Sequence, residues 1–204
     1  MTSQDIVTES SSDEFDRAQS NRQGNNSWFV SSDNTTVIVF VHGVLSNSSS
    51  CWLNDDNKAY WPELIRLDKR VSEVDIFLSG YYTAIDSGAY EISDAADEVM
   101  RALKRQDALL RKPVMDYENI VFIAHSMGGI VTRYILEKYR EEFSNKKVGL
   151  MLYASPSYGS SKADQLSWLI KYFNHSQGIQ LKWGNWSLRD LDGRFRDLLA
   201  SACP

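Results

Sequence analysis

Four short apolar segments, separated by longer polar and mixed stretches, stand out between residues 35 and 155. They cover residues 37–41, 74–78, 120–124 and 148–153. None of them alternates strictly between apolar and polar positions, which is typical of strands buried on both faces, as in a parallel sheet. We therefore predict four strands at these positions.

The stretches between these strands show helical spacing. A short helix is predicted over residues 61–67, with Pro62 in its first turn. A longer helix is expected to be capped by Ser93 and to carry its apolar face as far as Leu110, and a third should span residues 128–139. Strands that alternate with helices indicate an α/β fold with a doubly wound, mostly parallel sheet and right-handed crossovers. After Pro156, residues 160–204 look helical and irregular, without a clear fifth strand.

The first 33 residues have a different composition, rich in Ser, Asp, Asn, Gln and Glu. Such a segment buries too little apolar surface to offset its ordering entropy. We predict that residues 1–33 are a disordered N-terminal tail and that residues 34–204 form one domain. The segment from Met1 to Ser12 is polar and acidic, so it does not resemble a secretory signal.

Composition narrows the classes of partner and cofactor. The 204 residues are 43% hydrophobic and 24% charged with a net charge of −5, which does not favour binding to nucleic acid. No apolar run is long enough for a transmembrane segment. Two cysteines, Cys51 and Cys203, are too few for a disulfide framework and indicate free thiols in a reducing, cytoplasmic setting. No His or Cys residues occur at the spacing of metal ligands, so no metal is expected, and no cofactor is expected either.

The chemistry concentrates in the segment Ala124-His125-Ser126-Met127-Gly128-Gly129, between a predicted strand and a predicted helix. This small-x-Ser-x-Gly pattern is the nucleophile elbow of the α/β-hydrolase fold, in which a tight turn requires small residues two positions before and after the serine. Ser126 is therefore the predicted catalytic nucleophile. The N–H of Met127 is the first predicted oxyanion-hole donor.

A second motif, His42-Gly43, ends the first predicted strand. In this fold the loop after that strand supplies the other oxyanion-hole donor, here the N–H of Val44. The alternative is an ordinary strand-to-helix turn that happens to contain a serine. That alternative does not account for the presence of both motifs. A serine nucleophile favours hydrolysis of an ester, thioester or amide, or transfer of an acyl group, through an acyl-enzyme.

The partners of a serine triad are harder to find. The order in this fold is Ser, then Asp or Glu, then His, and only His175 follows Ser126. His42 is expected to hold its own loop, and His125 to point away from the nucleophile. The acidic residues available are Asp164, Asp190, Asp192 and Asp197, none of which follows a predicted strand. We therefore expect the strands that carry the acid and the base to be absent, so that the domain is C-terminally incomplete.

A wider set of motifs resembles one group of lipase-like α/β-hydrolases, the serine-active-site-containing or GPI-inositol-deacylase-like branch. The motifs are Phe40-Val41-His42-Gly43, Cys51-Trp52, Tyr60-Trp61-Pro62, His125-Ser126-Met127-Gly128-Gly129, and Ser155-Pro156 with Gly159-Ser160. The resemblance implies hydrolysis of carboxylic esters or acyl lipids, with Ser126 as nucleophile and Val44 and Met127 as oxyanion donors. No position matches the family's acid and base, and Ala124 stands where the elbow usually has Gly.

Two functions from different classes remain. In the first, the chain is a serine esterase or lipase that acts on an ester or acyl-lipid substrate; an acyltransferase or thioesterase would look the same in sequence. In the second, it is a non-catalytic module that binds a protein partner within a larger protein. A group of aromatic residues in the C-terminal third fits either a lid over a substrate or ordinary core packing: Trp168, Tyr172, Phe173, Trp183 and Trp186.

Overall fold

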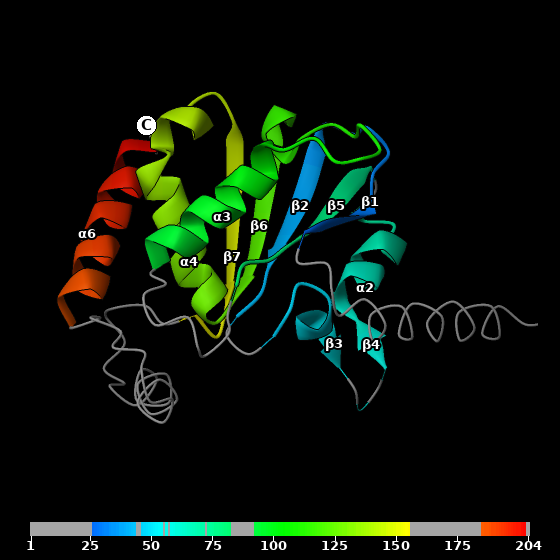
Figure 1. The fold of residues 1–204 in the computed structure, drawn as a ribbon, viewed down its shortest axis with the longest axis horizontal. Helices are drawn as coiled ribbons and strands as arrows, with labels where there is room; N and C mark the ends of the chain where they lie inside the picture. Colours follow the sequence, from blue (N-terminus) through cyan, green and yellow to red (C-terminus); the bar gives the residue numbers. More distant parts are fainter. Residues whose placement is uncertain are drawn as a thin grey trace, which may run out of the picture.

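A computed structural model describes residues 26–43, 46–54, 56, 58–71, 73–82, 92–155 and 185–202 of the chain. Its centre is a five-stranded sheet with the strand order β1-β5-β2-β6-β7 (Figure 1). The strands are β1 (Ser27–Val30), β2 (Thr36–Val41), β5 (Val74–Ser79), β6 (Asn119–His125) and β7 (Lys147–Tyr153). Strands β5, β2, β6 and β7 pair in parallel, and β1 joins the edge of β5 antiparallel. The four predicted strands and the mostly parallel sheet are confirmed.

Strand β1 corrects the predicted domain boundary. It lies within the segment that the composition assigned to a disordered tail, so that prediction is wrong for residues 26–33. The three apolar residues Trp28, Phe29 and Val30 are enough to form an edge strand, because Trp28 packs edge-on against Phe77 of β5 at 5.0 Å between ring centroids. The rest of the predicted tail lies outside the described residues.

Helices cover both faces of the sheet, as Figure 1 shows. Helices α3 (Ile92–Lys104) and α4 (Met127–Lys138) cross one face, and α6 (Asn185–Ala202) packs beside α4. The other face is covered by α2 (Trp61–Leu67), the 3-10 helix η1 (Ser50–Trp52) and a short hairpin of β3 (Leu53–Asn54) and β4 (Ala59–Tyr60). Two further 3-10 helices, η2 (Val114–Asp116) and η3 (Arg140–Phe143), precede β6 and β7. In the part of the chain that is described, no helix is long and apolar enough to cross a membrane.

Helix α3 is shorter than its apolar spacing predicted. It ends at Lys104, and Leu110 lies beyond it with its side chain 73% exposed and a φ of 56°. The Asp107 carboxylate accepts hydrogen bonds from the backbone N–H groups of Leu109 and Arg111. A side chain that bonds to the backbone ahead of it competes with the helical hydrogen bonds, so the segment forms a turn instead.

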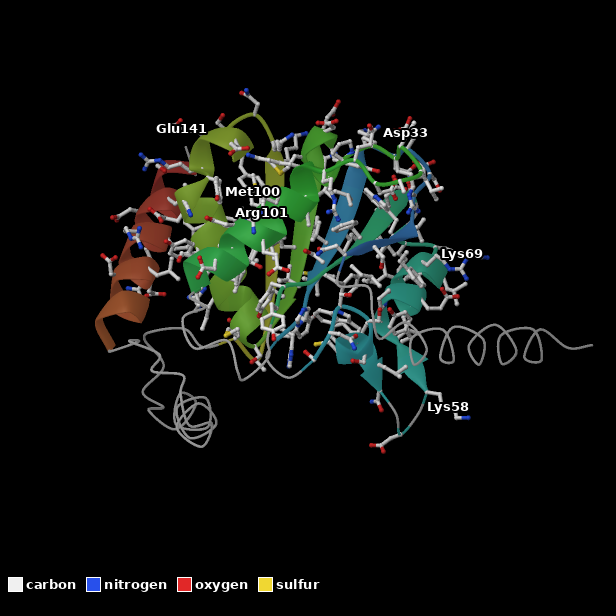
Figure 2. The ribbon with its side chains drawn as sticks, in the orientation of Figure 1. Asp33, Lys58, Lys69, Met100, Arg101 and Glu141 are labelled. Atoms are coloured by element: carbon white, nitrogen blue, oxygen red, sulfur yellow. The ribbon has the colours of Figure 1, made fainter. Side chains whose placement is uncertain are left out.

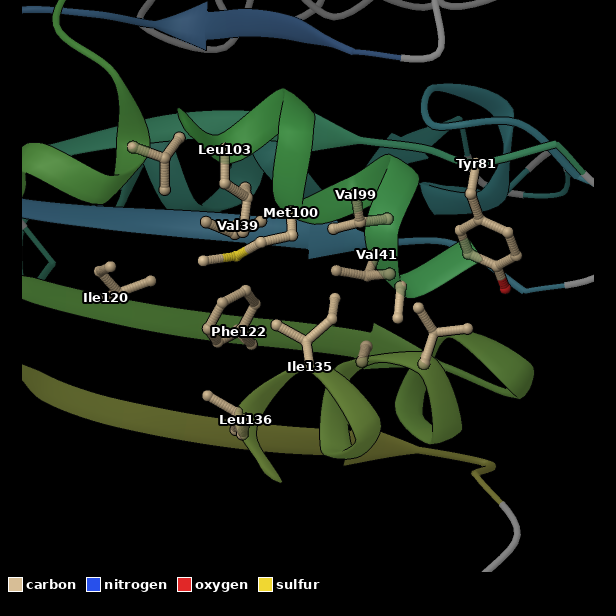
Figure 3. Close-up of a cluster of buried hydrophobic side chains, with 14 of the residues drawn as sticks. Val39, Val41, Tyr81, Val99, Met100, Leu103, Ile120, Phe122, Ile135 and Leu136 are labelled. Carbon is tan, nitrogen blue, oxygen red and sulfur yellow. The ribbon is translucent and has the colours of Figure 1, made fainter. Parts of the chain in front are cut away.

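Alternation along β2 divides the interior into two cores. Val37, Val39 and Val41 face α3 and α4, where they meet the apolar side chains shown in Figure 3. Ile38 and Phe40 face the opposite side and pack in a second core that includes Trp52 and Tyr60. Because both faces of the strand are buried, its apolar run is continuous, as in other doubly wound sheets.

The parallel strands give the sheet two different ends. In Figure 2, Asp33 and Glu141 lie near the amino ends of the strands, and Lys58 lies in the β3–β4 turn near their carboxyl ends. Ligands of doubly wound folds bind beyond the carboxyl ends, where the loops to the helices converge. The predicted elbow and the His42-Gly43 loop are both at this end.

Candidate active site

Ser126 occupies the junction between β6 and α4, as the elbow motif predicts. Its backbone has φ 55° and ψ −123°, a conformation that a residue with a Cβ adopts only under strain. Two hydrogen bonds hold it there: the Ser126 N–H donates to the Tyr153 carbonyl at 2.8 Å, and the Gly129 N–H donates to the Ser126 carbonyl at 3.1 Å. The strain is therefore maintained by β7 on one side and by the first turn of α4 on the other.

The small residues of the motif are required by close packing. A Cβ on Gly128 would lie 2.3 Å from the His42 carbonyl oxygen and 2.5 Å from that of Val41, so only glycine lets α4 start this close to the end of β2. Ala124 is fully buried at the end of β6. Its methyl group fits where the motif usually has glycine.

The Ser126 side chain is buried, and none of the described residues forms a hydrogen bond with its hydroxyl. The residue is 2% exposed, and its Oγ finds no donor or acceptor among the described residues. A buried hydroxyl without a partner is destabilising, and native proteins keep few of them. A hydroxyl left unbonded at a strained turn has the features expected of a reactive group that awaits a ligand.

The start of α4 offers donors beside this hydroxyl. The first N–H groups of a helix have no intrahelical acceptor, and Ser126 makes no side-chain cap to them. Met127 is the first residue of α4, so its N–H belongs to this set. Val44, the other predicted oxyanion donor, lies outside the described residues.

His42 has a structural role, as expected. The Tyr81 N–H donates to its Nε2 at 3.2 Å, so the proton of the neutral ring is on Nδ1, which lies 2.7 Å from the Gly43 carbonyl oxygen and donates to it. The ring is fully buried and stacked on Tyr81 at 4.8 Å between centroids. Burial lowers the pKa of His42, which keeps it neutral. With both nitrogens engaged, His42 has none left for Ser126.

His125 faces away from the first core and into the second. Its Nδ1 lies 3.5 Å from Cys51 Sγ, and its ring meets Trp52 edge-on at 6.4 Å between centroids. Burial lowers the pKa of His125 and raises that of the Cys51 thiol. Both groups are therefore neutral near pH 7, and His125 makes no hydrogen bond to Ser126 Oγ.

The acidic candidates in α6 are used elsewhere. Asp192 is ion-paired with Arg196 at 2.6 Å and with the buried Arg133 of α4 at 3.6 Å. The Asp190 side chain is 67% exposed and contacts Arg194 at 3.1 Å. Asp197 lies exposed on the same helix. The Asp192–Arg133 pair attaches α6 to α4, whereas the pairs with Arg194 and Arg196 lie within α6, and none of these contacts involves a histidine.

Several predicted residues lie where the structure gives no description. They are the triad candidates Asp164 and His175, the aromatic residues Trp168, Tyr172, Phe173 and Trp183, and Cys203. Trp186, in contrast, is the second residue of α6. Among the residues that are described, no three His, Cys, Asp or Glu side chains converge as they would around a metal ion.

Three residues contact the elbow, of which the sequence had singled out Gly43 as part of the site but not the contacts of Ser155 and Tyr153. A Cβ on Gly43 would lie 2.8 Å from the Cβ of Ser126, so the predicted loop touches the predicted nucleophile. Ser155 packs against Gly129, and its buried Oγ also lacks a partner in the described part. Tyr153 supplies the carbonyl that holds the Ser126 N–H. The Ser-Pro motif pointed to Ser155, but nothing in the sequence indicated its contact with Gly129.

Comparison with protein families gives one match. The family model described as "Putative serine esterase (DUF676)" matches residues 31–182, about three quarters of the chain. No curated protein matches.

Solved structures with a similar chain trace include esterases and lipases. One comes from work on LipS and LipT, two metagenome-derived lipolytic enzymes, with 14% identity, a TM-score of 0.43, and coverage of 70% of this chain and 50% of the other. A carboxylesterase study of the thaumarchaeon Nitrososphaera gargenis gives 14% identity, a TM-score of 0.43, and coverage of 84% and 60%. Esterase B from Lactobacillus rhamnosis gives 10% identity, a TM-score of 0.41, and coverage of 84% and 64%. The chain thus spans 50% to 64% of the length of these structures.

Proposed function

The chain belongs to the DUF676 serine esterase family, and we propose that it hydrolyses carboxylic esters, including acyl lipids, through an acyl-enzyme on Ser126. The observation that supports this best is the state of Ser126 itself. It combines a φ of 55° at a strand-to-helix junction with a buried Oγ that has no partner in the described residues. Strain and an unsatisfied polar group at one residue both cost stability, so a function is the natural reason for keeping them.

In the proposed reaction, Ser126 Oγ adds to the ester carbonyl carbon while its proton passes to a general base. The carbonyl oxygen gains negative charge and accepts hydrogen bonds from the N–H groups of Met127 and Val44. Collapse of this intermediate breaks the bond to the alcohol, which leaves with a proton and creates the acyl-enzyme. Water then adds to the acyl carbon and releases the acid, which restores the Ser126 hydroxyl.

The general base has to be sought outside the two described histidines. His42 has both nitrogens engaged, and His125 lies in the second core. His175 is the remaining histidine of the chain and is the residue to substitute if turnover is found. The alternative function, a non-catalytic module that binds a protein partner, predicts no turnover at all.

The decisive experiment is labelling with a fluorophosphonate probe together with hydrolysis of p-nitrophenyl butyrate. We expect wild type to be labelled and Ser126→Ala to lose both labelling and turnover, by at least about 10³-fold in rate. Ser155→Ala is the matched control, because it removes another buried hydroxyl beside the elbow that has no partner in the described part of the chain, and it should retain labelling. Wild type that neither labels nor turns over ester would favour the non-catalytic module.

A further inference from the structure

A small hollow opens beside the elbow, on the side of the sheet opposite α3 and α4. It has a volume of about 220 Å³ and is lined by η1, the β3 segment, the start of α2 and the carboxyl ends of β6 and β7. The side chains that matter for its chemistry are Cys51, Trp52, Trp61, His125 and Tyr153. None of these was assigned a role in the proposed reaction.

Aromatic rings form most of its walls. Trp61 meets Tyr153 edge-on, with 4.7 Å between centroids and planes at 88°, so the two rings make a right-angled corner. Trp52 stands 6.3 Å from Trp61, its plane tilted by 42°. Trp61 and Tyr153 are 36% and 37% exposed, so these two walls remain open to a ligand from solvent. Aromatic rings pack best against other rings in edge-on and offset arrangements, which such a corner provides.

The polar groups of the hollow are neutral. Among the described residues, its lining contains no Asp, Glu, Lys or Arg. Because burial lowers the pKa of His125 and raises that of Cys51, both groups are uncharged near pH 7. A charged ligand would therefore lose its hydration without gaining an opposite charge.

The lining also contains a buried hydrogen-bond donor. The Trp52 side chain is 4% exposed, and its indole Nε1 finds no acceptor among the described residues. A buried indole N–H normally has a partner. Because this nitrogen is itself buried, a ligand in the hollow contacts the Trp52 ring rather than its N–H.

The size of the hollow restricts the ligand further. An apolar cavity of about 150 Å³ is enough to bind benzene, whereas sites for drug-sized ligands start at about 300 Å³. The value here lies between these two, which suits one six-membered ring with a small substituent.

The hollow adjoins the proposed nucleophile through shared residues. His125 directly precedes Ser126, and the Tyr153 carbonyl accepts the hydrogen bond of the Ser126 N–H. A Cβ on Gly43 would touch both sides, at 2.8 Å from Ser126 Cβ and 3.2 Å from His125 Nδ1. The hollow is therefore lined by residues that directly precede or hold the strained turn.

We propose that this hollow binds the single aromatic ring of a small neutral ester, which packs against the rings of Trp52, Trp61 and Tyr153. The assignment of the ring to an ester rests on the proposed function, whereas binding of the ring depends only on the hollow. It makes aryl esters the favoured substrate class of the Ser126 site.

The test is a ligand-observed NMR titration of methyl benzoate with the Ser126→Ala variant, which cannot turn the ester over by the proposed route. Saturable binding in the millimolar range is expected, and it should be at least about fivefold tighter than that of methyl cyclohexanecarboxylate, which has the same size but no aromatic face. Equal binding of the two esters, or no saturation by methyl benzoate, would overturn the proposal.

Two wall variants localise the site. Trp61→Leu, at a partly exposed position, should weaken the binding of methyl benzoate about fivefold. Circular dichroism should show that the fold is intact. Trp52→Phe keeps an aromatic ring in the wall and should leave the binding of methyl benzoate and of toluene almost unchanged. Leu109→Ala, at a 73% exposed position outside the hollow, is the control that should change neither.

The two proposals fail in different ways. If methyl benzoate binds, Trp61→Leu weakens that binding, and fluorophosphonate does not label Ser126, the results would support ring binding in the hollow and contradict the proposed esterase activity. If fluorophosphonate labels Ser126 but methyl benzoate does not bind, the results would support the esterase activity and contradict the proposed preference for aryl esters.

Discussion

The two ends of the central sheet differ in how fully their buried polar groups are hydrogen-bonded. At the amino end, Asp75 is fully buried at the start of β5, and its carboxylate accepts four hydrogen bonds. The donors are the Ser32 N–H at 2.7 Å, the Asn34 N–H at 3.1 Å, the Asn34 side-chain amide at 2.9 Å and the Tyr117 hydroxyl at 2.6 Å. A buried carboxylate needs such a set of donors, because burial without them is costly.

At the carboxyl end, three buried polar atoms have no partner among the described residues, although the buried His42 beside them is bonded at both ring nitrogens. Trp52 Nε1, Ser126 Oγ and Ser155 Oγ lack partners among the described residues, and all three lie at or next to the elbow. In addition, Ser126 holds a strained backbone. The hydrogen bonds of the buried carboxylate at the amino end thus stabilise the fold. At the carboxyl end, the unbonded groups and the strained turn lower stability, and a ligand could satisfy such groups. The following predictions test this contrast, from the largest expected effect to the smallest.

Asp75→Ala should have the largest effect. The substitution removes the common acceptor of four donors and leaves several of them buried and unpaired, which should lower the free energy of unfolding by about 3–5 kcal/mol. Urea denaturation measures this. Asp190→Ala, which removes a 67% exposed carboxylate from one ion pair, should cost less than about 1 kcal/mol. Similar losses for the two variants would contradict a special role for the amino-end network.

Gly128→Ala should be the most damaging small change at the carboxyl end. The new methyl group would lie 2.3 Å from a backbone carbonyl oxygen that cannot easily move, so we expect a loss of about 3 kcal/mol. Gly193→Ala in α6 is the matched control, since a Cβ there meets nothing within 4 Å. It should stabilise the protein by about 0.5–1 kcal/mol through helix propensity alone. A mild effect at Gly128 would mean that α4 can shift away from β2.

Ser126→Gly should raise stability, in contrast to substitutions at the amino end. Glycine adopts a φ of 55° without steric strain, so this variant should be about 1 kcal/mol more stable than Ser126→Ala, which keeps the strain. Thermal unfolding of the two variants measures the cost of the backbone strain, because neither variant has the hydroxyl. If the alanine variant were the more stable one, the turn would not store strain.

The two ends should also respond to opposite extremes of pH. At the carboxyl end, burial lowers the pKa of His42 and of His125 in the folded protein. Their contribution to stability is fully present above the unfolded value of about 6.5 and is lost as pH falls below it, because the unfolded chain then binds more protons. Unfolding free energies measured from pH 7.5 to 5 should decrease, and His125→Gln should make that slope smaller. An unchanged slope would show that His125 titrates as freely when folded as when unfolded.

At the amino end, burial and the neighbouring Asp75 raise the pKa of Tyr117. Its contribution is fully present below the unfolded value of about 10 and is lost as pH rises above it, because the unfolded chain then releases the phenolic proton first. Tyr117→Phe should be less stable than wild type near neutral pH, since Asp75 loses one donor. The gap between the two should narrow above pH 10. A constant gap would exclude this titration.

The local features of the site were predictable from sequence. The four parallel strands, the helices that follow them and the position of Ser126 between β6 and α4 all depend on residues that are neighbours along the chain. Strand apolarity and a tight small-x-Ser-x-Gly turn are local requirements, so their residue types can be recognised directly. The end of α3 escaped prediction, because the hydrogen bonds of the Asp107 side chain overrode the apolar spacing.

The features that depend on distant residues were decided by the tertiary structure alone. Strand β1 forms because Trp28 finds Phe77 almost fifty positions later, and its three apolar residues do not predict that pairing. The role of His42 depends on Tyr81, and the hollow brings Trp52 and Trp61 against Tyr153. Sequence determines which groups are available and how the chain turns locally. Which of the buried groups find a partner, and which are left for a ligand, is determined only when the strands assemble side by side.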